Sequence, residues 1–290
     1  MVKFLYNKQF LLILLLAVSY GSFGAGGCGS GGSGTNKQVK INGLIEEVIG
    51  GGSVSGIQVT VFEGGNRKDR DTTDALGEFT LRFRLRSETA QVTIEFDGPG
   101  FTLSRVITVA IRSDVSLGVV IDVSPPSITF TNWTVNQERI NVSRFDDYIF
   151  NETEAVVRID GNGRKCIIAK GESRVEITAD SISLLDCSEG ISAESFGLVI
   201  LEAVFDIDLL ASKDGINAKD NSVVRLAMEA SAIDNNITVT SINENGIRAS
   251  GSSGVTIDPQ NDCTISGGKN AINESGTAVV DPDGCTLVDQ

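Results

Sequence analysis

A short pattern recurs along the second half of this 290-residue chain. Each copy places an isoleucine eight residues before a valine, with small or polar residues between them. The five pairs are Ile167/Val175, Ile191/Val199, Ile216/Val224, Ile247/Val255 and Ile272/Val280. The isoleucines are 24, 25, 31 and 25 residues apart. This pattern constrains the fold strongly, because one copy holds too few apolar residues to bury a face by itself and must stack on its neighbours.

A period near 24 residues without helical patterning predicts a right-handed parallel β-helix of about five or six coils over residues 163–290. The repeated isoleucines and valines would point inward and stack from coil to coil. The 31-residue spacing predicts a loop of about six extra residues within "ASAIDNNITVTSINEN". A second β-sandwich is the rival architecture for this half of the chain.

Residues 38–123 have a different pattern. Apolar residues alternate in short runs such as "SGIQVTVFE", "GEFTLRFRL" and "AQVTIEFDG", which glycine-rich or polar turns separate. Runs of this length and spacing predict a seven-stranded-type β-sandwich, so the whole fold is expected to be all-β. The double proline at Ser124-Pro125-Pro126 marks a boundary, and residues 124–162 are interpreted as a linker and N-terminal cap of the coil stack.

The sandwich segment also contains the motif "TDALGEFTL" from Thr73 to Leu81. With Ile41-Asn42-Gly43 before it and Gly100-Phe101 after it, this segment resembles the carboxypeptidase regulatory-like family, whose fold is transthyretin-like. The resemblance implies an accessory module that binds, spaces or stabilises, and kinship with starch-binding-like sandwiches implies carbohydrate binding. Its phenylalanines are expected in the core rather than on a sugar platform; they are Phe62, Phe79, Phe83, Phe96 and Phe101.

The N-terminus reads as an export signal. Two lysines precede the apolar run from Phe10 to Val18, which is too short to span a membrane. "AGGC" then resembles a bacterial lipobox, although Ala25 stands where leucine is usual. The resemblance implies a signal peptide over residues 1–27, lipidation of Cys28 and a Gly/Ser tether over 28–37. Gly29 suggests the outer membrane or cell surface of a bacterial envelope, and ordinary signal cleavage is the alternative.

Composition excludes several functions. The chain has no histidine, which excludes Ser-His-Asp and Cys-His catalytic sites and histidine-ligated zinc. The formal charge of −14 argues against a nucleic-acid partner, because phosphate binding requires a basic surface. No metal site or cofactor is predicted. Calcium has weak support, since "DGNG" at 160–163 and "DPDG" at 281–284 read as turns.

Four cysteines remain if Cys28 is lipidated, an even number that suits two disulfides in an oxidising compartment. Cys263 and Cys285 hold matching repeat positions and could join neighbouring coils. Cys166 and Cys187 match less well, so only a corner between them would bring them together. Buried free thiols are the alternative for both pairs.

Parallel β-helices are often polysaccharide lyases or hydrolases, as in the pectate-lyase-like proteins. Such an enzyme would gather carboxylates and an arginine or lysine on one face of the stack; weak candidates are Asp206, Asp208, Asp214, Asp220 and Arg225. No catalytic residue is assigned, because aspartates in turns are usually only solvated. We therefore expect a membrane-anchored, non-enzymatic binding or structural module, whose partner would be a glycan or a surface protein. A polysaccharide-active enzyme and a purely structural envelope protein are the alternatives.

Overall fold

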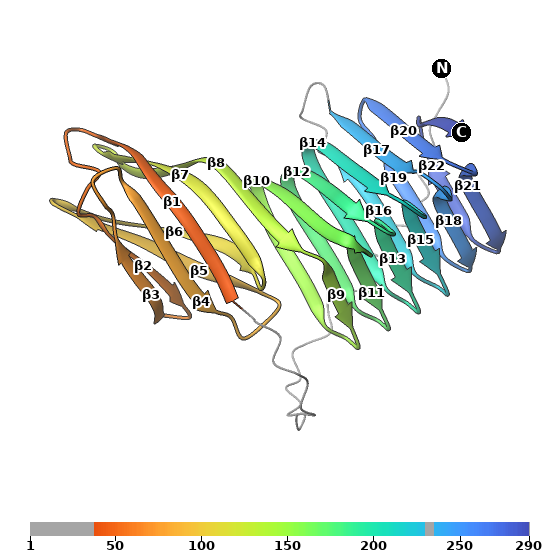
Figure 1. Cartoon of the computed structure of the whole chain (residues 1–290), viewed down its shortest axis with the longest axis horizontal. Coiled ribbons are helices and arrows are strands. Elements are labelled where there is room, and N and C mark those ends of the chain that lie inside the picture. Colours follow the sequence, from red (N-terminus) through yellow and green to blue (C-terminus); the bar gives the residue numbers. More distant parts are fainter. Residues whose placement is uncertain (1–37, 230–234, 290) are drawn as a thin grey trace, which may run out of the picture. The chain divides into compact units, whose positions relative to one another are not determined.

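The computed structural model describes residues 38–229 and 235–289, which belong to one compact unit. Every regular element in these residues is a β-strand, as expected for an all-β chain (Figure 1). These residues contain no helix that is long and apolar enough to cross a membrane. The expected signal peptide, Cys28 and the tether lie outside the described residues.

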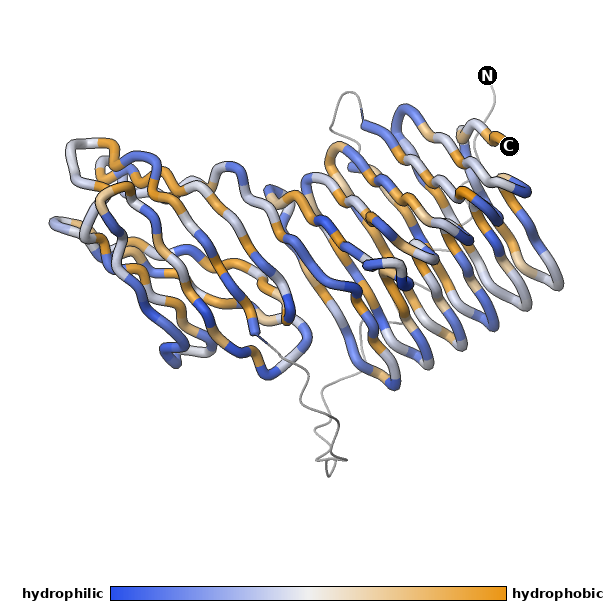
Figure 2. The backbone as a smooth tube through the Cα atoms, viewed as in Figure 1, coloured by the Kyte–Doolittle hydropathy of each residue, from blue (hydrophilic) through white to orange (hydrophobic). Residues whose placement is uncertain are grey.

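The N-terminal part is a β-sandwich. Its first seven strands are β1 (Gln38–Ile49), β2 (Gln58–Glu63), β3 (Asn66–Thr72), β4 (Glu78–Arg84), β5 (Thr89–Gly98), β6 (Phe101–Ala110) and β7 (Ser113–Val123). One sheet has the order β3-β2-β5-β6, and the facing layer has the order β4-β1-β7-β8, where β8 is Pro126–Glu138. Hydrophobic and hydrophilic residues alternate along these strands (Figure 2), so one side of each strand enters the core.

Phenylalanines fill the sandwich interior. Phe79, Phe83 and Phe96 are buried, and the rings of Phe79 and Phe96 meet edge to face with centroids 5.9 Å apart. Phe62 and Phe101 are half-buried. The prediction that these side chains belong to the core rather than to an exposed platform therefore agrees with their burial.

The C-terminal part is a parallel β-solenoid of about six turns. We call its three strand columns face 1, face 2 and face 3. Face 1 consists of β9 (Ile140–Ser143), β11 (Ile167–Lys170), β13 (Ile191–Glu194), β15 (Ile216–Lys219), β18 (Asn245–Gly251) and β21 (Asn270–Gly276).

Faces 2 and 3 share three long strands. Each of these strands supplies face 2 with its first part and face 3 with its last part: β10 (Asp147–Arg164), β12 (Arg174–Cys187) and β14 (Leu198–Ala211). Later coils use separate strands, with β16 (Val223–Met228), β19 (Gly254–Asp258) and β22 (Val279–Pro282) on face 2. Face 3 continues with β17 (Asn236–Ser241), β20 (Asp262–Gly267) and β23 (Thr286–Asp289).

The predicted repeat register is confirmed. All five repeat isoleucines pair in sequence on face 1, and all five repeat valines pair in sequence on face 2. A further coil precedes them, because Ile140 pairs with Ile167 and Tyr148 pairs with Val175. This first coil lies inside the segment 124–162 that was expected to be a linker and cap. Its two residues keep the spacing of eight, but tyrosine replaces valine.

The long repeat has its extra residues between β16 and β17. In the preceding coil, Ala203 and Asp206 lie on either side of the corresponding bend. Their partners in the long coil are Met228 and Asn236, which are farther apart in the sequence. The insertion therefore falls at one bend and leaves the register of all three faces intact. Residues 230–234 of this insertion are not among the described residues.

Two disulfides fasten the solenoid. Cys263 and Cys285 occupy equivalent places on face 3 of adjacent coils, with their Cα atoms 4.5 Å apart. Cys166 and Cys187 are joined where one coil ends and the next begins, with a Cα separation of 5.5 Å. The backbone N–H of Cys166 donates to the carbonyl of Glu189 at this corner. Two disulfides are typical of an extracellular or envelope protein.

Strand β8 belongs to both parts of the fold. One edge pairs antiparallel with β7 from Pro126 to Gln137, and on the other edge Thr134–Glu138 pair in parallel with β10 of the solenoid. The turn at Ser124-Pro125-Pro126 joins β7 to β8 and contains a cis Ser124–Pro125 bond. The expected boundary is therefore a hairpin turn inside a continuous 13-stranded sheet.

A second set of contacts connects β6 to β10. Arg105 is ion-paired with Glu154 at 2.6 Å, and its guanidinium lies over the rings of Phe130 and Trp133. The backbone N–H of Thr108 donates to the Glu152 carboxylate. Burial raises the pKa of Glu152, although the Thr108 hydrogen bonds and the charge of Arg105 act in the opposite direction.

We expect the double variant Cys263→Ser/Cys285→Ser to loosen the C-terminal coil selectively. A cross-link that closes a loop of this length contributes about 3 kcal/mol by restricting the unfolded chain. Hydrogen exchange of amides in β22 and β23 should therefore accelerate, while amides in β13 keep their protection. Equal protection of β22 and β23 with and without the cross-link would contradict a fastening role.

We also expect Glu152→Gln to increase the free energy of unfolding at about pH 7. A raised pKa means that the folded state binds the proton more tightly than the unfolded chain. The wild-type protein thus loses stability as the pH rises through that pKa. The gain should be no more than about 1 kcal/mol, because solvent screens a half-buried group. It should vanish near pH 4, where the carboxyl group becomes protonated in the unfolded chain as well. Denaturation at both pH values measures it, with exposed Glu138→Gln as the control; a gain that persists at pH 4 would contradict the assignment.

Candidate functional site

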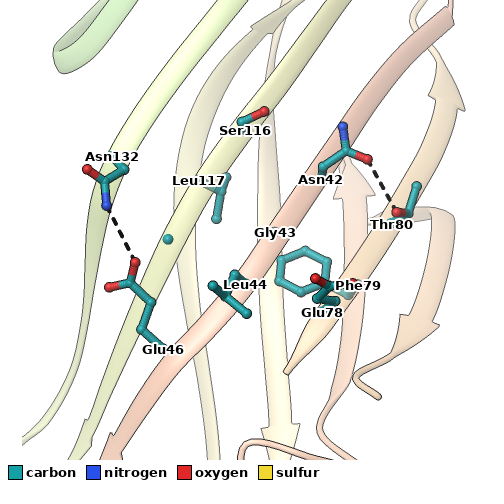
Figure 3. Close-up of a pocket in the computed structure, with 11 residues that line it drawn as sticks. Asn42, Gly43, Leu44, Glu46, Glu78, Phe79, Thr80, Ser116, Leu117 and Asn132 are labelled. Atoms are coloured by element: carbon teal, nitrogen blue, oxygen red, sulfur yellow. Dashed lines mark hydrogen bonds between the residues drawn. The ribbon is translucent and has the colours of Figure 1, made fainter. Parts of the chain in front are cut away.

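A shallow hollow of about 420 Å³ lies on the outer surface of the sandwich, over β4, β1, β7 and β8 (Figure 3). Its lining combines amide, hydroxyl and carboxylate groups with a small apolar area. The lining residues are Asn42, Gly43, Leu44, Glu46, Glu78, Phe79, Thr80, Ser116, Leu117, Gly118 and Asn132. The outer face of a sheet is usually flat, so the hollow requires a local cause.

Two strand irregularities produce the hollow. The pairing of β1 with β7 shifts register between Ile45 and Glu47, and the pairing of β7 with β8 shifts between Ser116 and Gly118. Asn132 lies at the second irregularity and has a left-handed backbone with φ of 49°. Extra residues in a strand redirect side chains. The two irregularities therefore bring Glu46 and Asn132 towards Gly118 from opposite sides.

Gly118 leaves room for the Glu46 carboxylate. A Cβ atom at position 118 would lie 2.4 Å from Glu46 Oε1 and 2.1 Å from the Thr131 hydroxyl oxygen. With glycine in place, the Thr131 hydroxyl donates to Glu46 at 2.8 Å and the Asn132 amide donates at 3.5 Å. These bonds hold the carboxylate at the edge of the hollow, as Figure 3 shows for Asn132.

The other side of the hollow is lined by β1 and β4. The Thr80 hydroxyl donates to the Asn42 side-chain oxygen at 3.3 Å (Figure 3). The Phe79 ring packs where a side chain of residue 43 would be, so Gly43 lets an apolar surface approach the base. Leu44 is 39% exposed at the rim. Donors, acceptors and an apolar contact area together suit a small polyhydroxylated ligand.

The candidate carboxylates of the solenoid do not form one group. Asp206 and Asp208 are neighbours on face 3, and burial, with the charges of Asp208 and Asp180, raises the pKa of Asp206. Asp214 lies at the corner before face 1, and Asp220 lies in the turn after face 1. Arg225 is on face 2, where its nearest charged partner is Asp258 at 3.8 Å. No three metal-binding side chains cluster in the part of the chain that the structure describes.

Asp214 instead belongs to a side-chain ladder that starts in the interior. It is 5% exposed and accepts hydrogen bonds from the backbone and side-chain nitrogens of Asn245, at 3.2 and 2.9 Å. Asn270 donates in turn to the side-chain oxygen of Asn245 at 3.0 Å. Side-chain hydrogen bonds therefore follow the stack from coil to coil at this corner. The repeat contains the signal for this ladder, because "DGI", "NGI" and "NAI" place these polar residues at one repeat position.

An ion-paired network covers part of face 1. Lys165 lies 2.8 Å from Glu189 and 3.5 Å from Glu194, and its ammonium donates to the Ser192 hydroxyl at 2.9 Å. A lysine beside a serine could indicate a nucleophilic site. Ser192 is fully buried, however, so its hydroxyl is not accessible to a substrate in this conformation. We interpret the network as a cross-coil contact.

The sequence patterns did not predict the hollow. Gly43 and Gly118 are interruptions within strands, which is a sign of a close approach or bulge. That sign does not reveal which side chain occupies the space, since Glu46, Gly118 and Asn132 come from three different strands. The expected lipidation site, Cys28, lies outside the described residues, and the four remaining cysteines form the two solenoid disulfides.

Comparisons with known proteins do not identify a family for this chain. No protein-family model matches the chain, and no curated protein matches it. Among solved structures, 4 chains match. One is 5-hydroxyisourate hydrolase of Klebsiella pneumoniae, which is 14% identical with a TM-score of 0.24. The match covers 33% of this chain and 96% of the hydrolase, and it supports no conclusion about activity.

Proposed function

We propose that this chain is an exported, lipid-anchored envelope protein whose folded part is a non-enzymatic binding module. Its recognition site is the hollow around Glu46, Gly118 and Asn132, and its ligand is a carbohydrate. The observation that carries the proposal is the convergence of polar groups on the outer face of a sheet. In this proposal the solenoid is a rigid arm that presents the module.

The chemistry of the hollow supports a sugar ligand. A sugar ring offers hydroxyl groups that both donate and accept, together with small apolar C–H surfaces. The hollow offers an ordered carboxylate at Glu46, amides at Asn42 and Asn132, and the exposed part of Leu44. Hydrogen bonds to a charged group are among the stronger ones that such a site can form.

The alternative is a polysaccharide lyase or hydrolase with carboxylates on the solenoid. It has less support, because Asp206, Asp214 and Asp220 lie in different parts of the coil rather than around one groove. A purely structural role has support from the coil ladders and disulfides. It does not account for the Glu46 carboxylate that Thr131 and Asn132 hold over Gly118.

We expect residues 36–290, which form one compact unit, to bind glycans on an array, with and without calcium. Glu46→Gln and Asn132→Ala should weaken that binding about tenfold, because the first replaces a charged acceptor with a neutral amide and the second removes an amide. Gly118→Val should abolish binding by filling the hollow. Asp208→Asn on face 3 is the matched control and should bind normally. A blank array, or equal binding by all variants, would overturn the proposal.

The same samples test the enzyme alternative. Wild-type protein is incubated with the array polysaccharides, and new reducing ends or unsaturated products are measured. The binding proposal expects none. Product formation that disappears in Asp206→Asn or Asp208→Asn would establish the enzyme instead.

Lipidation has a separate test in bacterial cells that express the full chain. We expect globomycin, which inhibits the lipoprotein signal peptidase, to accumulate the uncleaved precursor. Cys28→Ser should also leave the precursor uncleaved. Normal processing in the presence of globomycin would remove the anchor from the proposed function.

A further inference from the structure

One corner of the solenoid carries two exposed phenylalanines in the same column. The corner is the turn between face 1 and face 2, and its column contains Phe145, Glu172, Phe196 and Asn221 on four successive coils. The backbone N–H of Phe145 donates to Gly171, that of Glu172 donates to Ser195, and that of Phe196 donates to Asp220, at 3.2 to 3.3 Å. These hydrogen bonds continue the parallel ladder through the turn, so the two phenylalanines are two coils apart.

Neither phenylalanine is explained by the fold. Both have a left-handed backbone with φ of 70°, which bulky side chains rarely adopt, and their side chains are 73% and 58% exposed. Asn221 occupies the same column with φ of 64° and suits that conformation. Phenylalanine therefore adds backbone strain and exposed apolar surface without adding core packing. Its occurrence twice in one column indicates a role in binding.

The spacing of the column suits a particular ligand. Neighbouring coils lie about 4.8 Å apart, so the backbone positions of Phe145 and Phe196 are about 10 Å apart with Glu172 midway. A group seated over Glu172 would therefore lie between the two phenylalanine positions, about 5 Å from each along the stack, so both rings can approach a cation placed there. The carboxylate of Glu172 has no hydrogen-bond or ion-pair partner among the described residues. A cation is the group that both the rings and the carboxylate attract.

We propose that Phe145, Glu172 and Phe196 form a surface site for an organic cation, either a quaternary ammonium group or the ammonium group of a lysine side chain. The net charge of −14 attracts such ligands over longer distances. Within the described residues, cation–ring contacts involve Arg105 with Phe130 and Trp133, so no side-chain cation lies over the rings of Phe145 and Phe196, although Arg144 is next to Phe145 in the chain. Lys170, on the same coil as Glu172, is paired with Glu194 at 2.9 Å.

The central carboxylate also decides between this ligand and a lipid bilayer. Two exposed phenylalanines on one corner could enter a membrane, but Glu172 would then enter with them at a large desolvation cost. A protein partner that only covered apolar surface would bury the same unpaired carboxylate. The site lies outside the sandwich hollow and goes beyond the proposed function, so either proposal can fail without the other.

The test is an NMR titration of residues 36–290 that follows phenylalanine ring signals. The probes are choline, its uncharged carbon analogue 3,3-dimethylbutan-1-ol, and N-acetyl-lysine methylamide. Choline or the lysine amide should bind with a dissociation constant of about 1–10 mM, since exposed cation–π contacts are weak. The probe whose titration saturates shows whether the site binds a quaternary ammonium group or a lysine ammonium group. The uncharged analogue should bind at least about tenfold more weakly.

Substitutions test whether the cation binds at Phe145, Glu172 and Phe196. Phe145→Asn, Phe196→Asn and Glu172→Gln should each weaken binding about threefold to tenfold. Phe205→Asn, at an exposed phenylalanine elsewhere on the solenoid, should leave binding unchanged. The two asparagine variants should melt at the same or a higher temperature, because asparagine suits the left-handed turn; this separates lost binding from lost folding. Equal binding of choline and its uncharged analogue, no saturation by either cation, or unchanged binding by all three site variants would overturn the proposal.

Discussion

Parallel hydrogen bonding between successive coils is the constraint on which most of this structure depends. A coil cannot bury its own isoleucine and valine, so each one relies on the coils beside it. The chain meets this requirement by keeping the spacing of eight residues on faces 1 and 2 while it tolerates change at the bends. The insertion between β16 and β17 lies at a bend, and the Asp214–Asn245–Asn270 ladder lies at the corner where face 1 begins, so neither disturbs the strand register.

This requirement also explains where functional side chains can occur. Inward positions pack in the core, and outward positions on face 1 include cross-coil ion pairs such as Lys170–Glu194. Corners and strand irregularities are freer, because their side chains contribute least to the ladders. Both proposed sites fit this division: the hollow depends on irregularities in β1 and β8, and the cation site depends on a left-handed corner.

The all-β class, the coil register and the position of the long loop follow from residue patterns within one strand or one repeat, and matching repeat positions point to the Cys263–Cys285 pair. Cys166 and Cys187 do not match in the repeat, and it is the corner between them that brings them together. Tyr148 shows one limit of such patterns. It occupies the valine column of the first coil, so the spacing of eight was present but the residue type concealed it. The hollow shows another limit, since Glu46, Gly118 and Asn132 meet only because two separate pairings slip in register. Asp214 shows a third, because a carboxylate in a sequence does not reveal whether it faces a substrate or an asparagine in the next coil.

The shared strand β8 gives the solenoid a defined starting point. Repeat arrays whose ends are equivalent can begin to fold at any repeat. Here the first parallel pairing, between β8 and β10, uses a strand that the sandwich already holds through β7. The sandwich is thus a template on which coils are added in one direction, away from β8. A chain organised in this way can gain or lose whole coils over evolutionary time while its sandwich keeps the same attachment.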